Sequence, residues 1–582
     1  IRALGPAELH WMLTTFQLGH WQPLSWLTLA LDYRVWGLDA SGYHLTSLLL
    51  HVLNAVLLFA LARRLLDRAG LDERRALAGA ALGALLWSVH PLRVESVAWV
   101  TERRDVLATF FTLVALLAYT RGSIPATLAA AVFAVLAKAS AMVIPVFLVI
   151  LDVYPLRRLG GARGWTVRRV WLEKVPFFAL AIAAAVVAAA AQRSAGALRP
   201  LAEVTLAHRA GAAMYGLGFY LWKTIVPRRL LPMYEYPLGM SPLYPLALAG
   251  VATAVVVAVA AIALRRRAPG IAAAFVAYLA AIAPTLGLAQ AGPQVVADRY
   301  AYLSTIGWSI VAGGLAVAGT TMQRARAVAA AVAIVVLAVL TARQTTTWHD
   351  PVMLWSRVAA LEPTNAFALK SLGDAARVAG DADGAIRWYE RALALRPYAD
   401  AEMNLAAVLA QRGRVDDAVA HYRAAIRADP GYAFAYTSYG VLEADRGHLD
   451  EAIAAHRRAL AIDPNLMEAH ANLAAALEDL GRDDEAKREY AEALRLRPSA
   501  EVYNNLGLLA LKEQRADEAV AMFRRAVALR ADIPVVYQNL ARALTAAGDR
   551  DGAAAALETA LRLDPNLAGA RAMLDGLRAA AQ

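Results

Sequence analysis

The sequence contains no cysteine among its 582 residues, and charged residues make up only 18% of it. The absence of cysteine excludes disulfides and thiolate metal sites. The low charge and the 59% share of hydrophobic residues exclude a disordered chain and a single water-soluble domain. Also absent are a P-loop, a glycine-rich dinucleotide motif, an HExxH motif and a nucleophile elbow. Nothing therefore indicates ATP hydrolysis, so any chemistry must use a substrate activated beforehand.

Charge divides the chain into two parts of different character. Residues 1–350 hold 31 Lys and Arg against 15 Asp and Glu, whereas residues 351–582 hold 28 against 33. A basic, apolar part followed by a mildly acidic part is typical of a membrane domain joined to a water-soluble domain. The basic residues stand between apolar runs, where membrane topology accounts for them. We therefore expect no nucleic-acid partner.

Ten apolar runs, each interrupted by charge, recur in the first part. They cover residues 45–62, 76–89, 106–120, 125–137, 141–154, 176–191, 243–264, 271–288, 301–319 and 327–342. Several are shorter than the roughly 20 residues that span a bilayer, but Ala-rich helices pack closely in bundles. The sequence therefore predicts a polytopic helical membrane domain over residues 45–345, preceded by a partial extracytoplasmic loop at 1–44.

Basic residues in the loops predict the orientation of this domain. Alternate loops hold 17 Lys and Arg on one side and 8 on the other. The positive-inside rule puts the richer set, including residues 63–75, 157–174 and 265–267, in the cytoplasm. Residues 1–44 and the C-terminal part then lie on the opposite side of the membrane.

The segment at 208–226 does not fit this alternation, because a span there would put residues 265–267 outside. Its aromatic residues and Lys223, Arg228 and Arg229 are typical of headgroup depth. We interpret it as an interfacial or re-entrant helix, with a plain additional span as the alternative.

A period of 33–34 residues begins near residue 350. It is marked by Pro363, Pro397, Pro430, Pro464, Pro498 and Pro565, with Ala531 at the missing proline position. In one unit Leu372-Gly373 precedes Ala385, Tyr389 and Ala392. Small residues let two antiparallel helices approach, the aromatic ring fills the seam, and proline stops the second helix.

This pattern resembles the tetratricopeptide repeat (TPR). The resemblance implies an α-solenoid over residues 346–582, with about six repeats after a half-repeat at 348–363 and a capping helix near 567–581. Such solenoids present a groove to a protein or peptide partner. A passive spacer or a dimerisation arm is the alternative.

Three polar clusters stand at membrane boundaries. The first is HPLRVESVAWVTERRD, residues 90–105. On a continuous helix Glu95 and Glu102 share one face, with Arg103 and Asp105 to either side. A carboxylate there can act as a base or orient a hydroxyl, and an arginine can hold a phosphate. A salt-bridged loop that only joins two spans is the alternative, and His90 before Pro91 is equally compatible with a helix stop.

The second cluster is ADRYAYLS, residues 297–304, where Arg299 precedes Tyr300. An arginine flanked by aromatic residues suits an anionic lipid headgroup, although ordinary aromatic anchoring explains it nearly as well. The third cluster joins HWQPLSWL (20–27) to YHLTSLLLHVLN (43–54). His51 lies within a span, where an ionisable group suggests function. A neutral imidazole bonded to a neighbouring helix is the alternative.

The order WQPLSWL, YHLTSLLLHVLN, HPLRVESVAWVTERRDVL and ADRYAYLS, followed by TPRs, resembles the transmembrane-and-TPR (TMTC) proteins and their bacterial relatives. That family is similar to the GT-C glycosyltransferases. The resemblance implies an all-α fold and transfer of a sugar from a polyprenyl-phosphate carrier to a protein hydroxyl outside the cytoplasm. In the animal members the sugar is mannose.

The polar clusters and the resemblance together give the expected site residues at the membrane boundary, where His90, Glu95, Arg103, Asp105 and Arg299 match the family's motifs. They are Glu95 and Asp105 as catalytic residues, Arg103, Arg299 and Tyr300 as ligands of the lipid phosphate, and His90 and His51 as supporting residues. The usual GT-C acidic residue belongs to the first outer loop, so we expect it upstream of Ile1, because Asp32 and Asp39 stand too late. The phosphate leaving group needs stabilisation by cationic residues or a divalent metal, and no metal ligand is assigned.

The expected partners are membrane lipid, the lipid-linked sugar donor and an acceptor protein or peptide in the TPR groove. The Ala- and Arg-rich composition suggests a bacterial inner membrane and a periplasmic TPR domain. Two other functions stay open. One is a non-catalytic scaffold for envelope assembly, and the other is a ligase that transfers a lipid-linked oligosaccharide.

Overall fold

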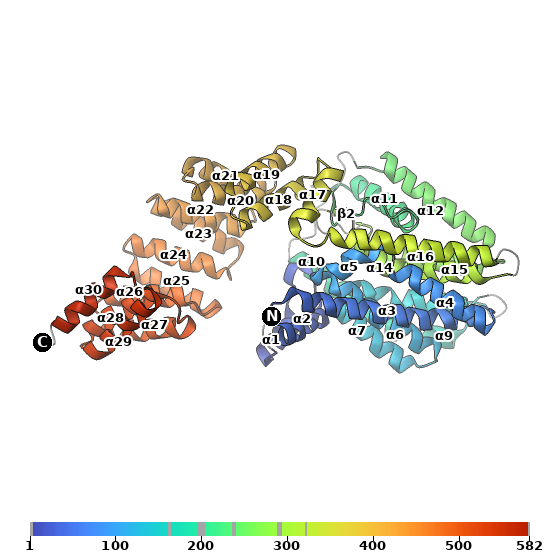
Figure 1. The fold of residues 1–582 in the computed structure, drawn as a ribbon, viewed down its shortest axis with the longest axis horizontal. Coiled ribbons are helices and arrows are strands. Elements are labelled where there is room, and N and C mark those ends of the chain that lie inside the picture. Colours follow the sequence, from blue (N-terminus) through green and yellow to red (C-terminus); the bar gives the residue numbers. More distant parts are fainter. Residues whose placement is uncertain are drawn as a thin grey trace. The chain divides into compact units, whose positions relative to one another are not determined.

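The computed structural model describes residues 4–160, 164–194, 204–235, 240–287, 294–319 and 323–579. Helices dominate these residues, and the strands β1 (Tyr234–Glu235) and β2 (Gln294–Val296) form a short antiparallel ribbon. The chain divides into two compact units, Ile1–Asn365 and Ala366–Gln582 (Figure 1). The expected all-α fold class is confirmed.

Each apolar run of the first part overlaps a helix of the first unit. These helices are α3 (Ala40–Arg68), α4 (Glu73–Ser88), α6 (Arg103–Thr120), α7 (Ile124–Ala137), α8 (Ile144–Val153), α10 (Val175–Ser194), α12 (Pro245–Leu264), α13 (Pro269–Ile282), α15 (Ile306–Val317) and α16 (Gln323–Thr346). Four helical segments of the described chain are long and apolar enough to cross a membrane, and up to six are if two bent pairs count as spans. The chain is a membrane protein.

The remaining helices of this unit lie before, between and after those of the bundle. They are α1 (Pro6–Thr14), α2 (Pro23–Trp36), α5 (Val94–Ala98), α9 (Arg168–Leu172), α11 (Leu206–Ile225), α14 (Ala301–Ser304) and α17 (Pro351–Leu361). The two bent pairs are α4 with the segment Pro91–Ala98, and Asp298–Ser304 with α15, each bent by 58°. Both bends fall in the polar motifs singled out from the sequence.

Glycines hold the two bent pairs together. α4 packs along α15, and a side chain at Gly313 would lie 2.1 Å from the carbonyl oxygen of Gly79. At Gly83 it would lie 2.7 Å from the carbonyl oxygen of Ser309. Such an approach is available only to helices with small residues at the contact. It brings the loops that follow α4 and precede α15 to the same end of the bundle.

The segment at 208–226 forms most of α11, which packs closely on α12 through Gly218 and Gly250. Trp222 is exposed on its surface. The placement of Lys223 near lipid phosphates is wrong, because its side chain is buried and its Nζ donates to the carbonyl oxygens of Arg228 and Arg229 at 2.5 and 3.0 Å. Whether α11 spans the membrane or lies in its interface stays a prediction.

The second unit consists of antiparallel helix pairs that stack in chain order. The pairs are α18 (Ala366–Val378) with α19 (Ala382–Leu395), α20 (Ala399–Gln411) with α21 (Val415–Ala428), α22 (Ala433–Asp445) with α23 (Leu449–Ile462), α24 (Met467–Asp479) with α25 (Asp483–Leu496), α26 (Ala500–Lys512) with α27 (Ala516–Leu529), and α28 (Pro534–Ala546) with α29 (Arg550–Leu563), followed by α30 (Ala568–Ala579). This arrangement is an α-solenoid of the TPR kind.

The repeat motif has the packing expected from its sequence. Tyr389 is fully buried, and a side chain at Gly373 would lie 2.6 Å from its ring. The same relation holds between Phe523 and Gly507. The glycine of the Leu-Gly pair therefore makes room for the aromatic ring of the second helix.

His456 occupies this seam position in α23, where the repeats described above have a tyrosine or a phenylalanine. It is 1% exposed, and neither imidazole nitrogen has a hydrogen-bond partner among the described residues. Burial lowers the pKa of His456 to about 4. The neutral ring therefore leaves two buried polar atoms unpaired, which costs about 1–3 kcal/mol relative to a paired group.

We expect His456→Phe to stabilise the α22–α24 region by about 1–2 kcal/mol, because the ring stays and the unpaired nitrogens go. Slower amide hydrogen exchange in α22 and α23 of the full chain is the measurement. Below pH 6.5 the histidine binds a proton in the unfolded chain but not in the folded one. The free energy of unfolding of the wild type should therefore fall between pH 6.5 and 4 by more than that of the variant. Tyr389→Phe is the control, since it removes a hydroxyl that is bonded to Asp374 (2.7 Å). Unchanged exchange in His456→Phe would contradict the assignment.

Candidate functional site

The loop from 90 to 105 is not the continuous helix that we expected. It comprises a 3-10 turn at Pro91–Arg93, α5, a second 3-10 turn at Val100–Glu102 and the start of α6. The break falls at Trp99, whose backbone is extended (φ −87°, ψ 106°). The break turns Glu95 and Glu102 toward one partner, Arg299, which enters from the other polar loop.

Glu95 and Arg299 form a buried ion pair between two loops 204 residues apart. Nη1 of Arg299 donates to Oε1 of Glu95 at 2.5 Å, and the backbone N–H of Arg299 donates to Oε2 at 2.8 Å. Glu95 is 2% exposed and Arg299 6%. Both carboxylate oxygens of Glu95 are thus occupied, and together they fix the position of the guanidinium.

Four further charges extend this pair. Glu102 lies 3.4 Å from Nε of Arg299 and accepts two hydrogen bonds from Arg104, at 2.6 and 3.0 Å. Lys138 donates to Oδ1 of Asp105 at 2.5 Å and lies 3.7 Å from Glu102. Three carboxylates therefore meet three cations. We call the six residues Glu95, Glu102, Arg104, Asp105, Lys138 and Arg299 the ionic cluster.

The surroundings of the ionic cluster control its protonation. Burial by itself would raise the pKa of Glu102, but Arg104, Lys138 and Arg299 hold it well below the usual value. His20 lies close by, and burial together with Arg104 and Lys138 lowers its pKa to about 3. Glu102 is therefore a carboxylate and His20 a neutral imidazole at physiological pH.

Two polar atoms of the ionic cluster have no hydrogen-bond partner in the described chain. They are Oδ2 of Asp105 and Nε of Arg299, and both are buried. Nε of Arg299 still faces Glu102 at 3.4 Å. Buried polar atoms are usually paired, so the Asp105 oxygen indicates a place for water or a ligand.

Aromatic rings cover the guanidinium of Arg299. Its central carbon lies 5.1 Å from the ring centre of Tyr300 and 5.4 Å from that of Trp99. Lys138 lies 5.7 Å from the Tyr300 ring. Tyr300 therefore contacts two cations through its face, and the structure brings it together with Glu95, Asp105 and Arg299.

Arg103 does not join the ionic cluster, contrary to the expectation that it flanks the face formed by Glu95 and Glu102. Its Nη1 lies 2.5 Å from Oδ2 of Asp32, and it donates to the carbonyl oxygen of Tyr43 (2.8 Å) and to the hydroxyl of Ser47 (3.2 Å). Arg103 is 1% exposed. The pair joins α2, α3 and α6. Asp105 pairs with Lys138 and not with a neighbouring arginine, because α6 begins at Arg103 and turns these side chains apart.

The two histidines lie in polar contacts outside the ionic cluster. Nε2 of His51 lies 3.1 Å from the carbonyl oxygen of Ser88, and Nδ1 lies 2.7 Å from the hydroxyl of Tyr302. A carbonyl only accepts, so Nε2 carries the hydrogen and Nδ1 accepts from Tyr302. This is the geometry of a neutral imidazole bonded to neighbouring helices. His90 likewise bonds the carbonyl of Thr224 (3.1 Å) and the backbone N–H of Leu92 (3.2 Å).

Sequence reasoning missed Lys138 and Arg104 as members of the site and the role of Asp32. A signal existed for Lys138, which is the only charged residue between the apolar runs 125–137 and 141–154. Asp32 lies in α2 of the N-terminal stretch and carried no comparable signal. Within the described residues no group of three or more His, Asp or Glu is placed to hold a metal ion. We therefore assign no metal ligand.

The fold defines a membrane protein with a C-terminal TPR solenoid, and comparison with known proteins agrees. Models of the tetratricopeptide repeat and TPR repeat match the second unit and the α17 region. The matched residues are 354–400, 370–433, 440–481, 471–533 and 535–567. The solved structures similar to this chain include MamA (25% identity, 25% of this chain and 85% of that one, TM-score 0.24) and YrrB, described as a TPR protein with an unusual peptide-binding site (20% identity, 32% and 96%, TM-score 0.27).

Curated relatives point to a more particular resemblance. The chain is 33% identical over 131 residues to "Protein O-mannosyl-transferase Tmtc1" of Drosophila melanogaster, a match covering 21% of this chain and 14% of the relative. It is 30% identical over 105 residues to human "Protein O-mannosyl-transferase TMTC3", covering 18% and 10%. These matches span no more than about a seventh of the relatives' length. The chain is thus similar to the TMTC proteins, and the resemblance seen in its motifs is confirmed.

Proposed function

We propose that the chain is a polytopic membrane glycosyltransferase of the GT-C type. It moves a sugar from a polyprenyl-phosphate carrier to a protein hydroxyl outside the cytoplasm, and its TPR solenoid binds the acceptor. The observation that carries this proposal is the buried ionic cluster with Oδ2 of Asp105, which has no hydrogen-bond partner in the described chain. The names of the curated relatives support the reaction class.

The ionic cluster offers the groups that such a transfer needs. The acceptor hydroxyl attacks the anomeric carbon, the bond from that carbon to the phosphate oxygen breaks, and polyprenyl phosphate leaves. Arg299, held in place by Glu95, stabilises the leaving phosphate with its positive charge. The free oxygen of Asp105 accepts the hydroxyl proton. Glu95 acts in this scheme as a positioning residue, because both of its oxygens are already bonded to Arg299.

The decisive experiment is a transfer assay with the full-length protein, a labelled polyprenyl-phosphate sugar and envelope proteins. We expect labelled O-linked protein, and Asp105→Asn should reduce it, because the amide cannot accept the hydroxyl proton. Absence of any labelled protein with the wild type would refute the proposal.

The same assay distinguishes the two alternatives. If the chain is a scaffold, no glycosylated product forms, and replacing the loop carboxylates with amides leaves its function unchanged. The observation in favour of a scaffold is that the three carboxylates of the ionic cluster are balanced by three cations. A ligase transfers a pre-assembled glycan in place of one sugar, which the mass of the product reveals.

Orientation provides a separate prediction. The 17-to-8 asymmetry of basic residues places residues 350–582 outside the cytoplasm, in the periplasm if the membrane is a bacterial inner membrane. A reporter that is active only in the cytoplasm, fused after Gln582, should therefore stay silent. The same reporter inserted between Arg74 and Arg75 should be active. Cytoplasmic activity at Gln582 would contradict both the orientation and the acceptor-binding role.

A further inference from the structure

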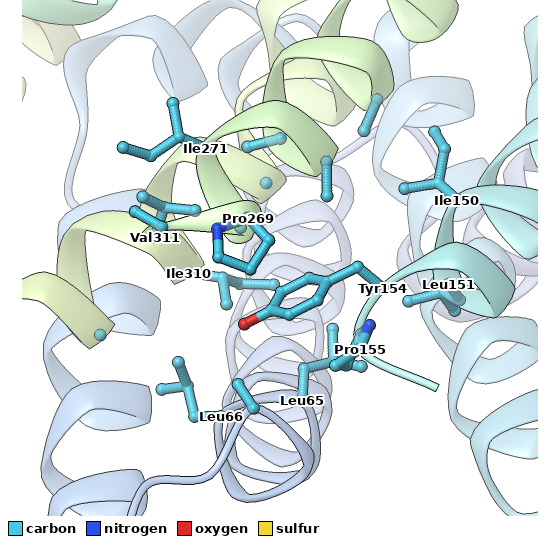
Figure 2. Close-up of a pocket in the computed structure, with 18 of the residues that line it drawn as sticks. Leu65, Leu66, Ile150, Leu151, Tyr154, Pro155, Pro269, Ile271, Ile310 and Val311 are labelled. Carbon is cyan, nitrogen blue, oxygen red and sulfur yellow. The ribbon is translucent and has the colours of Figure 1, made fainter. Parts of the chain in front are cut away.

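A second site lies at the other end of the membrane bundle, away from the ionic cluster. It is a cavity of about 470 Å³ between the ends of α3 and α8, the start of α13 and one side of α15. Its walls are aliphatic for the most part, and the ring of Tyr154 lies across it among Leu65, Leu66 and Pro269 (Figure 2). A volume of this size is in the range of small-ligand sites. The lining excludes a polar ligand from its interior but suits a hydrocarbon chain.

Charge is confined to three lining residues of this cavity, Arg157, Arg266 and Arg267. All three are exposed, and no acidic side chain of the described residues lies within ion-pair distance of any of them. This contrasts with the ionic cluster, where every cation has a carboxylate partner. Three guanidiniums without counterions at the edge of an apolar cavity complement one anionic headgroup with an attached chain.

The distance to the ionic cluster separates this cavity from the proposed donor site. Asn54 of α3 donates to the carbonyl oxygen of Val106, the residue after Asp105 (2.9 Å). Ala69, at the end of α3, lines the cavity. Fifteen residues of helix lie between Asn54 and Ala69, a rise of about 22 Å. That is most of the roughly 30 Å hydrocarbon thickness, so a phosphate held by the three arginines is not within reach of Arg299.

We propose that this cavity is a binding site for an anionic glycerophospholipid that is not a substrate. One acyl chain fills the space beside Tyr154, and the phosphate lies against Arg157, Arg266 and Arg267. The positive-inside rule puts these arginines at the cytoplasmic leaflet, where anionic lipid is available to them. The bound lipid fills the gap between α3, α8, α13 and α15, and it thereby stabilises the bundle from the side opposite the reaction.

The test uses the full-length protein, delipidated in mild detergent and titrated with phosphatidylglycerol or phosphatidylcholine. Native mass spectrometry counts the lipid that is bound, and thermal unfolding reports its effect on stability. We expect one phosphatidylglycerol per chain with at least tenfold preference over phosphatidylcholine, and a raised Tm. Arg266→Gln combined with Arg267→Gln should weaken phosphatidylglycerol binding at least tenfold.

Two variants keep the test independent of general effects. Arg265→Gln removes a charge from the same run at a residue that does not line the cavity, so it should bind phosphatidylglycerol as the wild type does. Ala273→Trp fills the cavity without changing charge and should abolish binding. The lipid-free Tm of each variant shows that it is folded.

Three results would overturn the proposal. One is equal binding of phosphatidylcholine. Another is an equal loss in Arg265→Gln and in the double variant, which would show a diffuse electrostatic attraction. The third is competition by glycerol phosphate at the concentration at which phosphatidylglycerol binds. The acyl chain of the lipid would then contribute nothing to binding.

Discussion

Glu95→Gln is expected to reduce sugar transfer by about 10- to 1000-fold, the range of positioning and general-base effects. The amide cannot accept from both N–H groups of Arg299, because one of its two positions is itself a donor. The variant also leaves Arg299 buried with only Glu102 beside it, and breaking a buried pair costs about 3–5 kcal/mol. A fall in Tm should therefore accompany the loss of activity. The measurements are transfer rate and thermal unfolding on the same preparation.

The variant that combines Glu95→Gln with Arg299→Gln separates the two effects. It removes both charges of the pair, so a large part of the lost stability should return, while transfer should stay as low as in the single variant or lower. If transfer returns together with stability, the pair is structural. Wild-type transfer in Glu95→Gln alone would remove this loop from the active site.

The second large effect is expected at Arg299→Lys. Lysine keeps the charge but loses the planar fork that holds Glu95 and a phosphate oxygen at once. Loss of one charge-assisted hydrogen bond costs about 1.5–3 kcal/mol, so affinity for the polyprenyl-phosphate sugar should fall by about 10- to 150-fold. An equilibrium binding titration of the protein with the polyprenyl-phosphate sugar measures this affinity.

Arg103→Lys is the matched control for Arg299→Lys. It makes the same chemical change in an equally buried arginine, whose hydrogen bonds all go to α2 and α3. It should lower stability and leave donor affinity within about twofold of wild type. If both variants lose donor affinity equally, the effect reports loosening of the bundle and Arg299 is only an anchor.

The fold was largely predictable because its elements carry strong local signals. The ten apolar runs and the proline period each identify a helix by composition and spacing alone. The break at Trp99 was not predictable, because nothing in VESVAWVTERRD stops a helix. The break accompanies tertiary contacts, in which Arg299 pairs with Glu95 on one side of Trp99 and with Glu102 on the other.

The candidate site was predictable in its members but not in its pairing. Glu95, Asp105, Arg299 and Tyr300 were identified by their position at membrane boundaries, and they lie in one cluster. Which cation pairs with which carboxylate depends on where α6 begins and on which way its first side chains point. Helical periodicity placed Arg103 beside the carboxylates of the loop, whereas it pairs with Asp32. Lys138 joins from a different helix, so its partners follow only from the packing of α6 on α7.

The span of 204 residues between Glu95 and Arg299 also has a consequence for how the protein is made. At about 5–20 residues per second, a ribosome needs about 10–40 s to synthesise the chain between them. During that interval Glu95 has entered the insertion machinery, but its partner Arg299 has not yet been synthesised. The nascent chain must keep the carboxylate hydrated, protonated or held by a chaperone until α15 docks on α4. Chains that end before Arg299 lack this final step, and they should be recognised and degraded as incomplete while chains that end beyond α16 are retained.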